Sequence, residues 1–390
     1  MKILLAKIVV LTVGIIIAIF TIKTGSFQKS DINFVREAPV TTEEVAEKIP
    51  AEEANKEIGG NLPKTTATTS AETAPKQAVT KQPAVKPAPV VVPPPEPPKP
   101  LIPLEVLNET ARAATVNIFC TTKTGGDFKP LSGSGIIIND WGVILTNAHV
   151  AQYLLLKDYG VKDFMSCAAR AGSPASPAYK VELLYLPTIW LAENANIIKK
   201  ETPEGTGEND YALLIITGSA TQTPLPQKFP YVGINIEQAD IKSDIPVLMV
   251  GYPANFLGGI ATQNSLWIVS SPSFITKLYY FNDKNNIDAF SVGSNILAQK
   301  GVSGGAAVNQ QSGKIEGVLT TISGGETTES RDLAAITTAH IGRSFKNNTG
   351  KDLLEYLNGD LSASLKEFTE NTLPLLTKML TSALDNPATN

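Results

Sequence analysis

The sequence contains few of the side chains that hold structural metal ions. Only two cysteines and two histidines occur among its 390 residues, and they lie far apart in the chain. A structural zinc site needs about four such ligands at short, paired spacings. We therefore expect no metal ion, and no motif in the sequence indicates another cofactor.

The chain also lacks a basic patch. Its 33 lysines and arginines are balanced by 37 aspartates and glutamates, which gives a net charge of −4. Nucleic-acid binding depends on clustered positive charge, so nucleic acid is not an expected partner. No sequence period of about 20 to 50 residues recurs, which excludes a repeat protein.

Aromatic residues are nearly absent between residues 39 and 103, where most of the prolines lie. The stretch "AVKPAPVVVPPPEPPKP" favours extended polyproline conformations and has too few large apolar side chains to form a core. We predict a disordered, proline-rich linker over residues 24–103.

The N-terminus carries a long uncharged run. "MKILLAKIVVLTVGIIIAIFTIK" has Lys2 and Lys7 and then no charge from Ile8 to Ile22. With the apolar residues before it and a snorkelling lysine, this run approaches the ~20 residues that span a bilayer. We predict a transmembrane signal-anchor over residues 1–23, with the rest of the chain outside the cytoplasmic membrane, either periplasmic or at the cell surface. A cleaved signal peptide is the alternative, although no A-x-A-like cleavage site follows.

Many short strand candidates occur between residues 104 and 348. The clearest is a hairpin in which Ile136–Ile138 and Val143–Leu145 flank the turn sequence Asn139-Asp140-Trp141-Gly142. Further apolar and β-branched runs lie at Thr115–Cys120, Lys180–Leu186, Tyr211–Ile216, Pro246–Val250, Ser265–Val269, Ala289–Val292, Ala306–Val308, Ile315–Thr321 and Ala334–Thr338. This pattern predicts an all-β sandwich or barrel.

Residues 349–390 show a different pattern. Leucines recur there at three-to-four-residue spacing, with interruptions near Gly359 and Pro374. This spacing predicts a C-terminal helical segment. The helices either pack back on the β domain or bind a partner.

Three residues at the ends of these strands have side chains suited to nucleophilic catalysis. His149 follows the hairpin in "TNAHV", and histidine transfers protons near neutral pH. Asp210 precedes a strand in "NDYALL", and a carboxylate can fix the tautomer of an imidazole base. Ser303 lies in "GVSGG", where glycines allow the N–H groups of Gly301 and Ser303 to converge on a developing oxyanion. Each residue alone is more simply a structural residue, and their combination on one β-rich chain indicates an active site.

In these motifs the sequence resembles the trypsin-like, chymotrypsin-fold serine peptidases, and among them the bacterial HtrA-like branch. "GSGIIINDWGVILTNAHV", "NDYALL" and "GVSGGAAV" are similar to that branch's histidine, aspartate and serine motifs. The resemblance implies two six-stranded antiparallel β-barrels over residues 104–348, with His149, Asp210 and Ser303 as a catalytic triad between them. It also implies hydrolysis of protein or peptide substrates through an acyl-enzyme.

The resemblance further implies a specificity pocket. Its walls would be Leu297 and Ala298 before the serine, and Thr320, Thr321 and Ile322 after it. No acidic residue occurs in either stretch. We therefore expect cleavage after small or medium apolar residues rather than after arginine or lysine.

The sequence departs from the family pattern in three places. Val302 stands where the family usually has Asn or Asp, and no "IVGG" start is present. The residues after Ser303 are too few for the PDZ domain that is common in the HtrA-like branch. The sequence leaves the oligomeric state open.

Two other functions compete with a trypsin-like peptidase. "GVSGG" also fits the G-x-S-x-G elbow of α/β-hydrolases, with Asp332 and His340 following in order. An elbow requires a helix after the serine, whereas the sequence there is β-like. The second alternative is a catalytically silent trypsin-fold binding module at the cell envelope, against which the unbroken motifs argue.

Cys120 and Cys167 lie on either side of the histidine hairpin. An exported domain meets an oxidising compartment, so we predict that they form a disulfide. Two buried free thiols are the alternative.

Overall fold

The computed structural model describes residues 100–123, 128–199, 207–254, 259–281, 283–321 and 332–385. The predicted signal-anchor and the predicted linker up to residue 99 lie outside the described residues. Within these described segments, no helix combines the length and the hydrophobicity needed to cross a bilayer.

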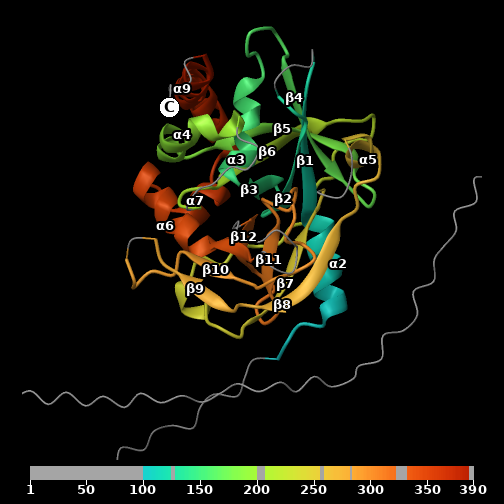
Figure 1. Ribbon diagram of the computed structural model, residues 1–390, viewed down its shortest axis with the longest axis vertical. Coiled ribbons are helices and arrows are strands. Elements are labelled where there is room, and N and C mark those ends of the chain that lie inside the picture. Colours follow the sequence, from blue (N-terminus) through green and yellow to red (C-terminus); the bar gives the residue numbers. More distant parts are fainter. Residues whose placement is uncertain are drawn as a thin grey trace, which may run out of the picture. The chain divides into compact units, whose positions relative to one another are not determined.

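The first half of the β domain is a closed antiparallel barrel, as expected (Figure 1). Its strand order is β1-β2-β3-β6-β5-β4. The predicted hairpin forms because the side-chain oxygen of Asn139 accepts a hydrogen bond from Val143 N at 3.0 Å, which closes the turn between β2 and β3. The strands are β1 Thr115–Thr122, β2 Leu131–Ile137, β3 Val143–Thr146, β4 Met165–Ala171, β5 Ser176–Tyr185 and β6 Ala212–Ser219.

The second half is not the closed six-stranded barrel that the resemblance implied. It is a seven-stranded sheet in the order β8-β7-β11-β12-β13-β10-β9, which makes a half-barrel. Its strands are β7 Pro246–Gly251, β8 Val269–Phe274, β9 Lys277–Tyr279, β10 Ala289–Ser291, β11 Ala306–Asn309, β12 Ile315–Thr321 and β13 Leu333–Thr337.

The sheet has a seventh strand because one nearly continuous stretch of chain forms both of its edge strands, β8 and β9. Only Ile275 and Thr276 separate β8 from β9. Ile275 N donates to Ile245 O at 3.0 Å, next to β7, and Thr276 N donates to Ser291 O at 2.8 Å, in β10. The chain therefore bends between two strands that pair with opposite ends of the sheet. Pro272 lies in the edge strand β8, where a missing N–H is tolerated.

The predicted strand Ser265–Val269 is also wrong, because β8 begins only at Val269. The preceding residues bond outside the second sheet. Leu266 O accepts from Ala175 N at 2.7 Å, and Ile268 O accepts from the Arg112 guanidinium at 3.1 Å. This segment therefore joins the second half of the domain to the first.

Helix α2 (Leu104–Ala114) lies beside β7 and β8 (Figure 1). Leu107, Ala111 and Ala114 are buried, and their spacing of three and four residues places them on one face of the helix. The shorter helices are α3 Ala148–Ala151, η1 Gln152–Leu156, α4 Thr188–Asn194, η2 Ala195–Lys199, η3 Gln238–Asp240 and α5 Gly259–Asn264.

The predicted C-terminal helices are present and pack back on the β domain. Phe368, Leu376, Leu380 and Leu384 are buried in the apolar cluster of the first barrel. Figure 1 shows α9 beside α4, on the opposite side of the domain from α2. The helices are α6 Thr338–Thr349, α7 Leu353–Asn358, α8 Leu361–Glu367, a π-helical turn η4 Phe368–Thr372, and α9 Leu373–Asp385.

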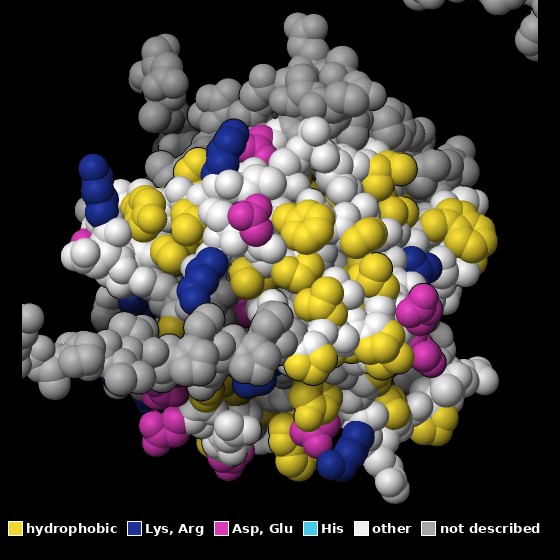
Figure 2. Space-filling view, turned by 90° about the horizontal axis from the view of Figure 1, so that it is seen from below, with side chains coloured by type: hydrophobic (Ala, Val, Ile, Leu, Met, Phe, Trp, Pro, Cys, Tyr) yellow, Lys and Arg dark blue, Asp and Glu magenta, His cyan; other side chains and the backbone are white. Residues whose placement is uncertain are grey.

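One face of the domain gathers apolar side chains. Figure 2 shows them from below, with acidic and basic side chains scattered between and around them, and no histidine is visible there. Large apolar side chains that are exposed in the described chain include Phe274 on β8 and Val106 on α2. Exposed apolar surface of this kind is common in soluble domains.

The predicted disulfide is confirmed. Cys120 on β1 and Cys167 on β4 are directly opposite each other in the sheet, and their sulfur atoms are bonded. The bond therefore ties the first barrel strand to the region that follows His149.

Removing the disulfide is expected to destabilise the domain. The bond links residues 47 positions apart, and a loop of this length corresponds to a chain-entropy contribution of at most about 4 kcal/mol. We expect the Cys120→Ala/Cys167→Ala double variant to lose about 2–4 kcal/mol in free energy of unfolding, measured by urea denaturation. Reductant should lower the wild-type midpoint and leave the variant's midpoint unchanged. Two reactive thiols in unreduced, denatured wild type would contradict the bond.

Candidate active site

His149 lies just beyond the end of a barrel strand. β3 ends at Thr146, and His149 sits on the single turn of helix α3. Its ring Nδ1 is 2.8 Å from Asp210 Oδ2, and its backbone N–H donates to Asp210 Oδ1 at 2.9 Å. An ionised carboxylate can only accept, so Nδ1 carries the proton and Nε2 keeps a free lone pair in the neutral ring.

Asp210 is held by more than its carboxylate. It lies two residues before β6, and it is buried. Asn147, two residues before His149, donates from its side-chain amide to Asp210 O at 2.8 Å. The segment that carries His149 is therefore hydrogen-bonded to both the side chain and the main chain of Asp210.

The environment of His149 favours its protonated form. Burial alone would lower the pKa of the imidazole, but the charge of Asp210 and its hydrogen bond outweigh that effect, so the pKa of His149 is raised. The ring keeps access to solvent, with 21 % of its side chain exposed. These are the properties of a base that works near neutral pH.

Ser303 lies in a tight turn just before β11. Gly305 N donates to Val302 O at 2.8 Å and so closes the turn around Ser303, and Gly301, just before it, has φ +95°. Gly304 follows the serine with φ +88°. Both values fall in the region that glycine adopts without strain, which explains why glycines flank the serine.

The Ser303 turn belongs to the second half of the domain but is fixed to the first half through Ser134 of β2. Ser134 N donates to Ser303 O at 2.7 Å, and its hydroxyl donates to Gly301 O at 2.7 Å. Ser134 O in turn accepts from the Thr146 hydroxyl at 2.7 Å, three residues before His149. These bonds bring the serine turn to the segment that carries the histidine.

Two backbone N–H groups at this turn are available as donors. Within the part of the chain that the structure describes, the N–H groups of Gly301 and Ser303 have no acceptor. The neighbouring N–H groups are used, because Gly304 N donates to Leu319 O and Gly305 N donates to Val302 O. The available pair is the one predicted to bind an oxyanion.

The residues predicted to form the specificity pocket have apolar surroundings. Leu297 and Ala298 are buried in the apolar cluster that also contains Val302 and Leu333. Thr320 and Thr321 lie on β12, where Thr320 is half-buried. The prediction for Ile322 falls outside the described residues.

Sequence reasoning missed Ser134, Thr146 and Asn147 as parts of this site. All three are fully buried polar residues, and buried polar groups require partners. They stand inside the motifs "GSG" and "TNAHV", but their partners lie far away in the chain. The sequence therefore offered no local signal for the contacts that they make.

The α/β-hydrolase alternative is wrong. A strand follows Ser303 instead of a helix, and His340 pairs with Asp288 at 2.8 Å rather than with Asp332. Asp332 is hydrogen-bonded to Ser291. Burial lowers the pKa of His340 despite its carboxylate partner, which suits a structural residue.

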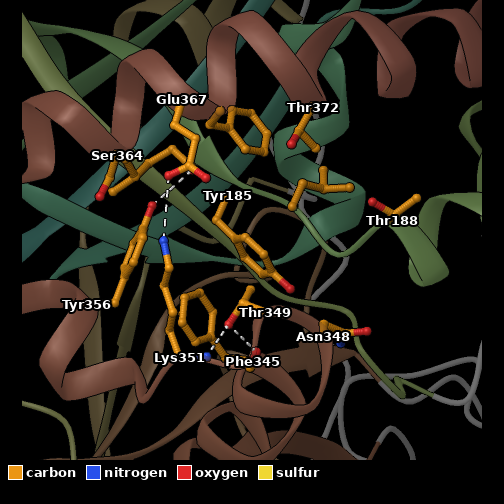
Figure 3. Close-up of a pocket in the computed structure, with 13 residues that line it drawn as sticks. Tyr185, Thr188, Phe345, Asn348, Thr349, Lys351, Tyr356, Ser364, Glu367 and Thr372 are labelled. Atoms are coloured by element: carbon orange, nitrogen blue, oxygen red, sulfur yellow. Dashed lines mark hydrogen bonds and ion pairs between the residues drawn. The ribbon is translucent and has the colours of Figure 1, made fainter.

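The described domain also contains a cavity away from these residues. It has a volume of about 300 Å³ and lies between β5, α6 and the C-terminal helices (Figure 3). Tyr185, Phe345 and Tyr356 contribute its aromatic walls. An ion pair between Lys351 and Glu367, 3.5 Å apart, lies at its exposed side. None of His149, Asp210 and Ser303 lines it.

Known proteins are similar to parts of this chain. The family model described as a trypsin-like peptidase domain matches residues 133–318. The chain is similar to the Rv3671c protease from M. tuberculosis in its active form, at 17 % identity and TM-score 0.37, over 66 % of this chain and 95 % of that one. It is also similar to the serine endoprotease from Yersinia pestis, at 22 % identity and TM-score 0.39, over 66 % of this chain and 69 % of that one. No curated protein matches the sequence.

The packing around Gly304 makes a direct test of this site's assembly. A Cβ at Gly304 would lie 2.0 Å from Ser134 O and 2.3 Å from the Thr146 hydroxyl. Gly160 has a similar φ of +71° but open space around it. We expect Gly160→Ala to cost about 1–2 kcal/mol in free energy of unfolding from backbone strain alone. Gly304→Ala should cost about 3–5 kcal/mol, because overpacking adds to that strain. Equal losses in urea denaturation would contradict the close approach of the serine turn to β2.

Proposed function

We propose that this chain, whose residues 133–318 match the trypsin-like peptidase model, is a serine endopeptidase with Ser303 as its nucleophile. The observation that carries this proposal is the pairing of His149 with Asp210, made through both oxygens of one buried carboxylate. The docking of the Ser303 turn on Ser134, next to the strand that leads to His149, supports it.

In the proposed reaction one imidazole accepts and returns a proton twice, once while the ester forms and once while water hydrolyses it. Ser303 Oγ attacks the carbonyl carbon of the peptide bond while His149 Nε2 takes the hydroxyl proton. The carbonyl oxygen becomes an oxyanion, which the N–H groups of Gly301 and Ser303 stabilise. The C–N bond then breaks, and His149 gives the proton to the leaving amine. Water, activated by the same ring, hydrolyses the remaining ester and restores Ser303.

Asp210 serves this reaction without taking a proton. It keeps the proton of the neutral ring on Nδ1, so that Nε2 faces the serine as a base. It also stabilises the imidazolium that forms in each step, and this effect is the cause of the raised pKa of His149.

We further propose that the domain acts outside the cytoplasmic membrane, tethered to it by residues 1–23. The uncharged run from Ile8 to Ile22 supports the tether. The disulfide between Cys120 and Cys167 supports an oxidising compartment.

A fluorophosphonate probe tests the proposed nucleophile directly. We expect the full-length chain to be labelled, and Ser303→Ala to abolish labelling. His149→Ala should slow it by several orders of magnitude, because the base that activates the serine is lost. His340→Ala is the matched control, since it removes the other histidine of the chain. It should keep most of the labelling rate, because Arg343 still ties helix α6 to Asp288.

Each outcome of this experiment distinguishes a function. Labelling that needs Ser303 and His149, but not His340, supports the peptidase. An unlabelled wild type would favour a catalytically silent trypsin-fold module. Labelling that survives Ser303→Ala would place the nucleophile elsewhere.

The apolar surroundings of Leu297 and Ala298 lead to a prediction of specificity. A basic substrate side chain would be desolvated there without a carboxylate partner, which is costly. We expect a peptide library to be cleaved after small or medium apolar residues, with the Ser303→Ala variant as background control. Cleavage dominated by arginine, lysine or glutamate would contradict this prediction.

A further inference from the structure

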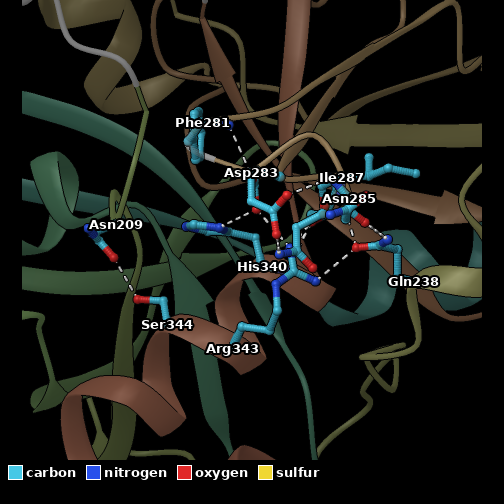
Figure 4. A network of polar contacts seen from close by, with 12 residues as sticks. Asn209, Gln238, Phe281, Asp283, Asn285, Ile287, His340, Arg343 and Ser344 are labelled. Atoms are coloured by element: carbon cyan, nitrogen blue, oxygen red, sulfur yellow. Dashed lines mark hydrogen bonds and ion pairs between the residues drawn. The ribbon is translucent and has the colours of Figure 1, made fainter.

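Ser344 of helix α6 lies at the centre of a buried group of hydrogen bonds next to the proposed active site. The residue is only 6 % exposed. Its hydroxyl donates to Asn209 Oδ1 at 2.6 Å and lies 3.0 Å from the Tyr211 hydroxyl. It also accepts from the Asn348 amide at 3.2 Å. Figure 4 shows the contact between Ser344 and Asn209.

The directions of these bonds follow from what each group can do. A serine hydroxyl donates one hydrogen bond and accepts two. Since its proton goes to Asn209 and the Asn348 amide can only donate, Tyr211 must be a donor to Ser344. Burial raises the pKa of Tyr211 to about 12, so that its hydroxyl keeps this proton. The Ser344 hydroxyl is then fully used.

The two partners Asn209 and Tyr211 are the sequence neighbours of Asp210. Asn209 has φ +60°, a backbone conformation that costs energy for a residue other than glycine and that asparagine adopts more readily than most. Tyr211 N donates to Asn209 O at 2.9 Å across Asp210. Asp210 thus projects from a tight, strained turn whose two sides are both bonded to one hydroxyl.

Helix α6 is itself anchored to the second sheet. His340 Nδ1 and Arg343 Nη2 contact Asp288 Oδ1 at 2.8 Å and 2.7 Å, and Asp288 immediately precedes β10. His340 and Ser344 are four residues apart, so they lie on the same side of the helix. Figure 4 shows this network beside the Ser344 contact. The helix therefore connects the half of the domain that carries Ser303 to the turn that carries Asp210.

We propose that Ser344 is a positioning residue for Asp210, a role that rests on the proposed peptidase function. By holding Asn209 and Tyr211, the hydroxyl fixes the turn from which the carboxylate reaches His149. Ser344 touches neither substrate nor a reacting atom. It acts through the geometry of the pair formed by His149 and Asp210, where a displacement of about 1 Å can reduce a rate about 100-fold.

The test measures the rate of fluorophosphonate labelling of the full-length chain as a function of pH. In the wild type, labelling should fall as the pH drops through the raised pKa of His149, because the protonated ring cannot act as a base. In Ser344→Ala we expect the plateau rate to fall about tenfold, since the hydrogen bonds of the hydroxyl and the alignment that they support are lost. The acidic limb should also move to lower pH, because a displaced Asp210 raises the pKa of His149 less.

Two further variants make the test specific. Thr349→Ala is the matched control, because it removes a hydroxyl from the same helix that donates to Phe345 O and accepts from Lys351 N, both at the end of that helix and away from Asn209 and Tyr211. Its rate and its pH profile should match the wild type. Asn209→Gly is the second probe, because glycine suits the observed φ and the variant loses only the side chain that Ser344 holds. It should shift the acidic limb in the same direction, even if Ser344→Ala does not fold.

The outcomes separate this role from the proposed function. Labelling that is absent in the wild type, or that survives Ser303→Ala, overturns the peptidase proposal. Labelling that depends on Ser303 but has an unmoved acidic limb in Ser344→Ala or Asn209→Gly overturns the role of Ser344 alone. A uniform loss of rate without that shift would assign Ser344 a purely structural part and would likewise reject the proposal.

Discussion

The arrangement of the candidate site depends on hydrogen bonds by which Ser134, in the first barrel, holds the Ser303 turn of the second sheet. His149 and Asp210 come from the first barrel and Ser303 from the second sheet. The proposed acyl transfer would require reacting atoms to approach within about 3–3.5 Å. Ser134 bonds to Ser303 O and Gly301 O on one side, and receives the Thr146 hydroxyl on the other. Because Ser134 is fully buried, water cannot replace these partners, and each bond is costly to leave unmade.

The chain's two histidines make the same contact with an aspartate, but their pKa values are shifted in opposite directions. Each ring places Nδ1 2.8 Å from an aspartate oxygen, yet the pKa of His149 is raised and that of His340 is lowered. Burial opposes protonation in both. At His340, however, Arg343 also binds the carboxylate of Asp288. Its positive charge lowers the pKa of His340 further, in addition to burial. In the described part of the chain no cation competes for Asp210, so the charge of this carboxylate outweighs the desolvation of His149.

The sequence predicted what depends on neighbouring residues. The hairpin before His149 follows from its turn residues, and the glycines around Ser303 follow from the φ values that the turn needs. Alternation of apolar residues predicted most strands. It could not predict that β8 and β9 would serve opposite edges of one sheet, because that depends on bonds from Ile275 and Thr276 to residues elsewhere in the chain. The prediction of a closed second barrel was wrong for this reason.

The candidate site shows the same limit more sharply. The motifs predicted the histidine, aspartate and serine of the candidate site from their chemistry, but not the residues that hold them. Ser134 is 169 positions from Ser303 and Ser344 is 135 positions from Asn209. Each is a serine with nothing local to mark it. The serine turn is held by a strand of the first barrel, and the aspartate turn by a helix that follows the second sheet. Neither half of the domain can therefore form the site alone, and the site's geometry is a property of the whole fold.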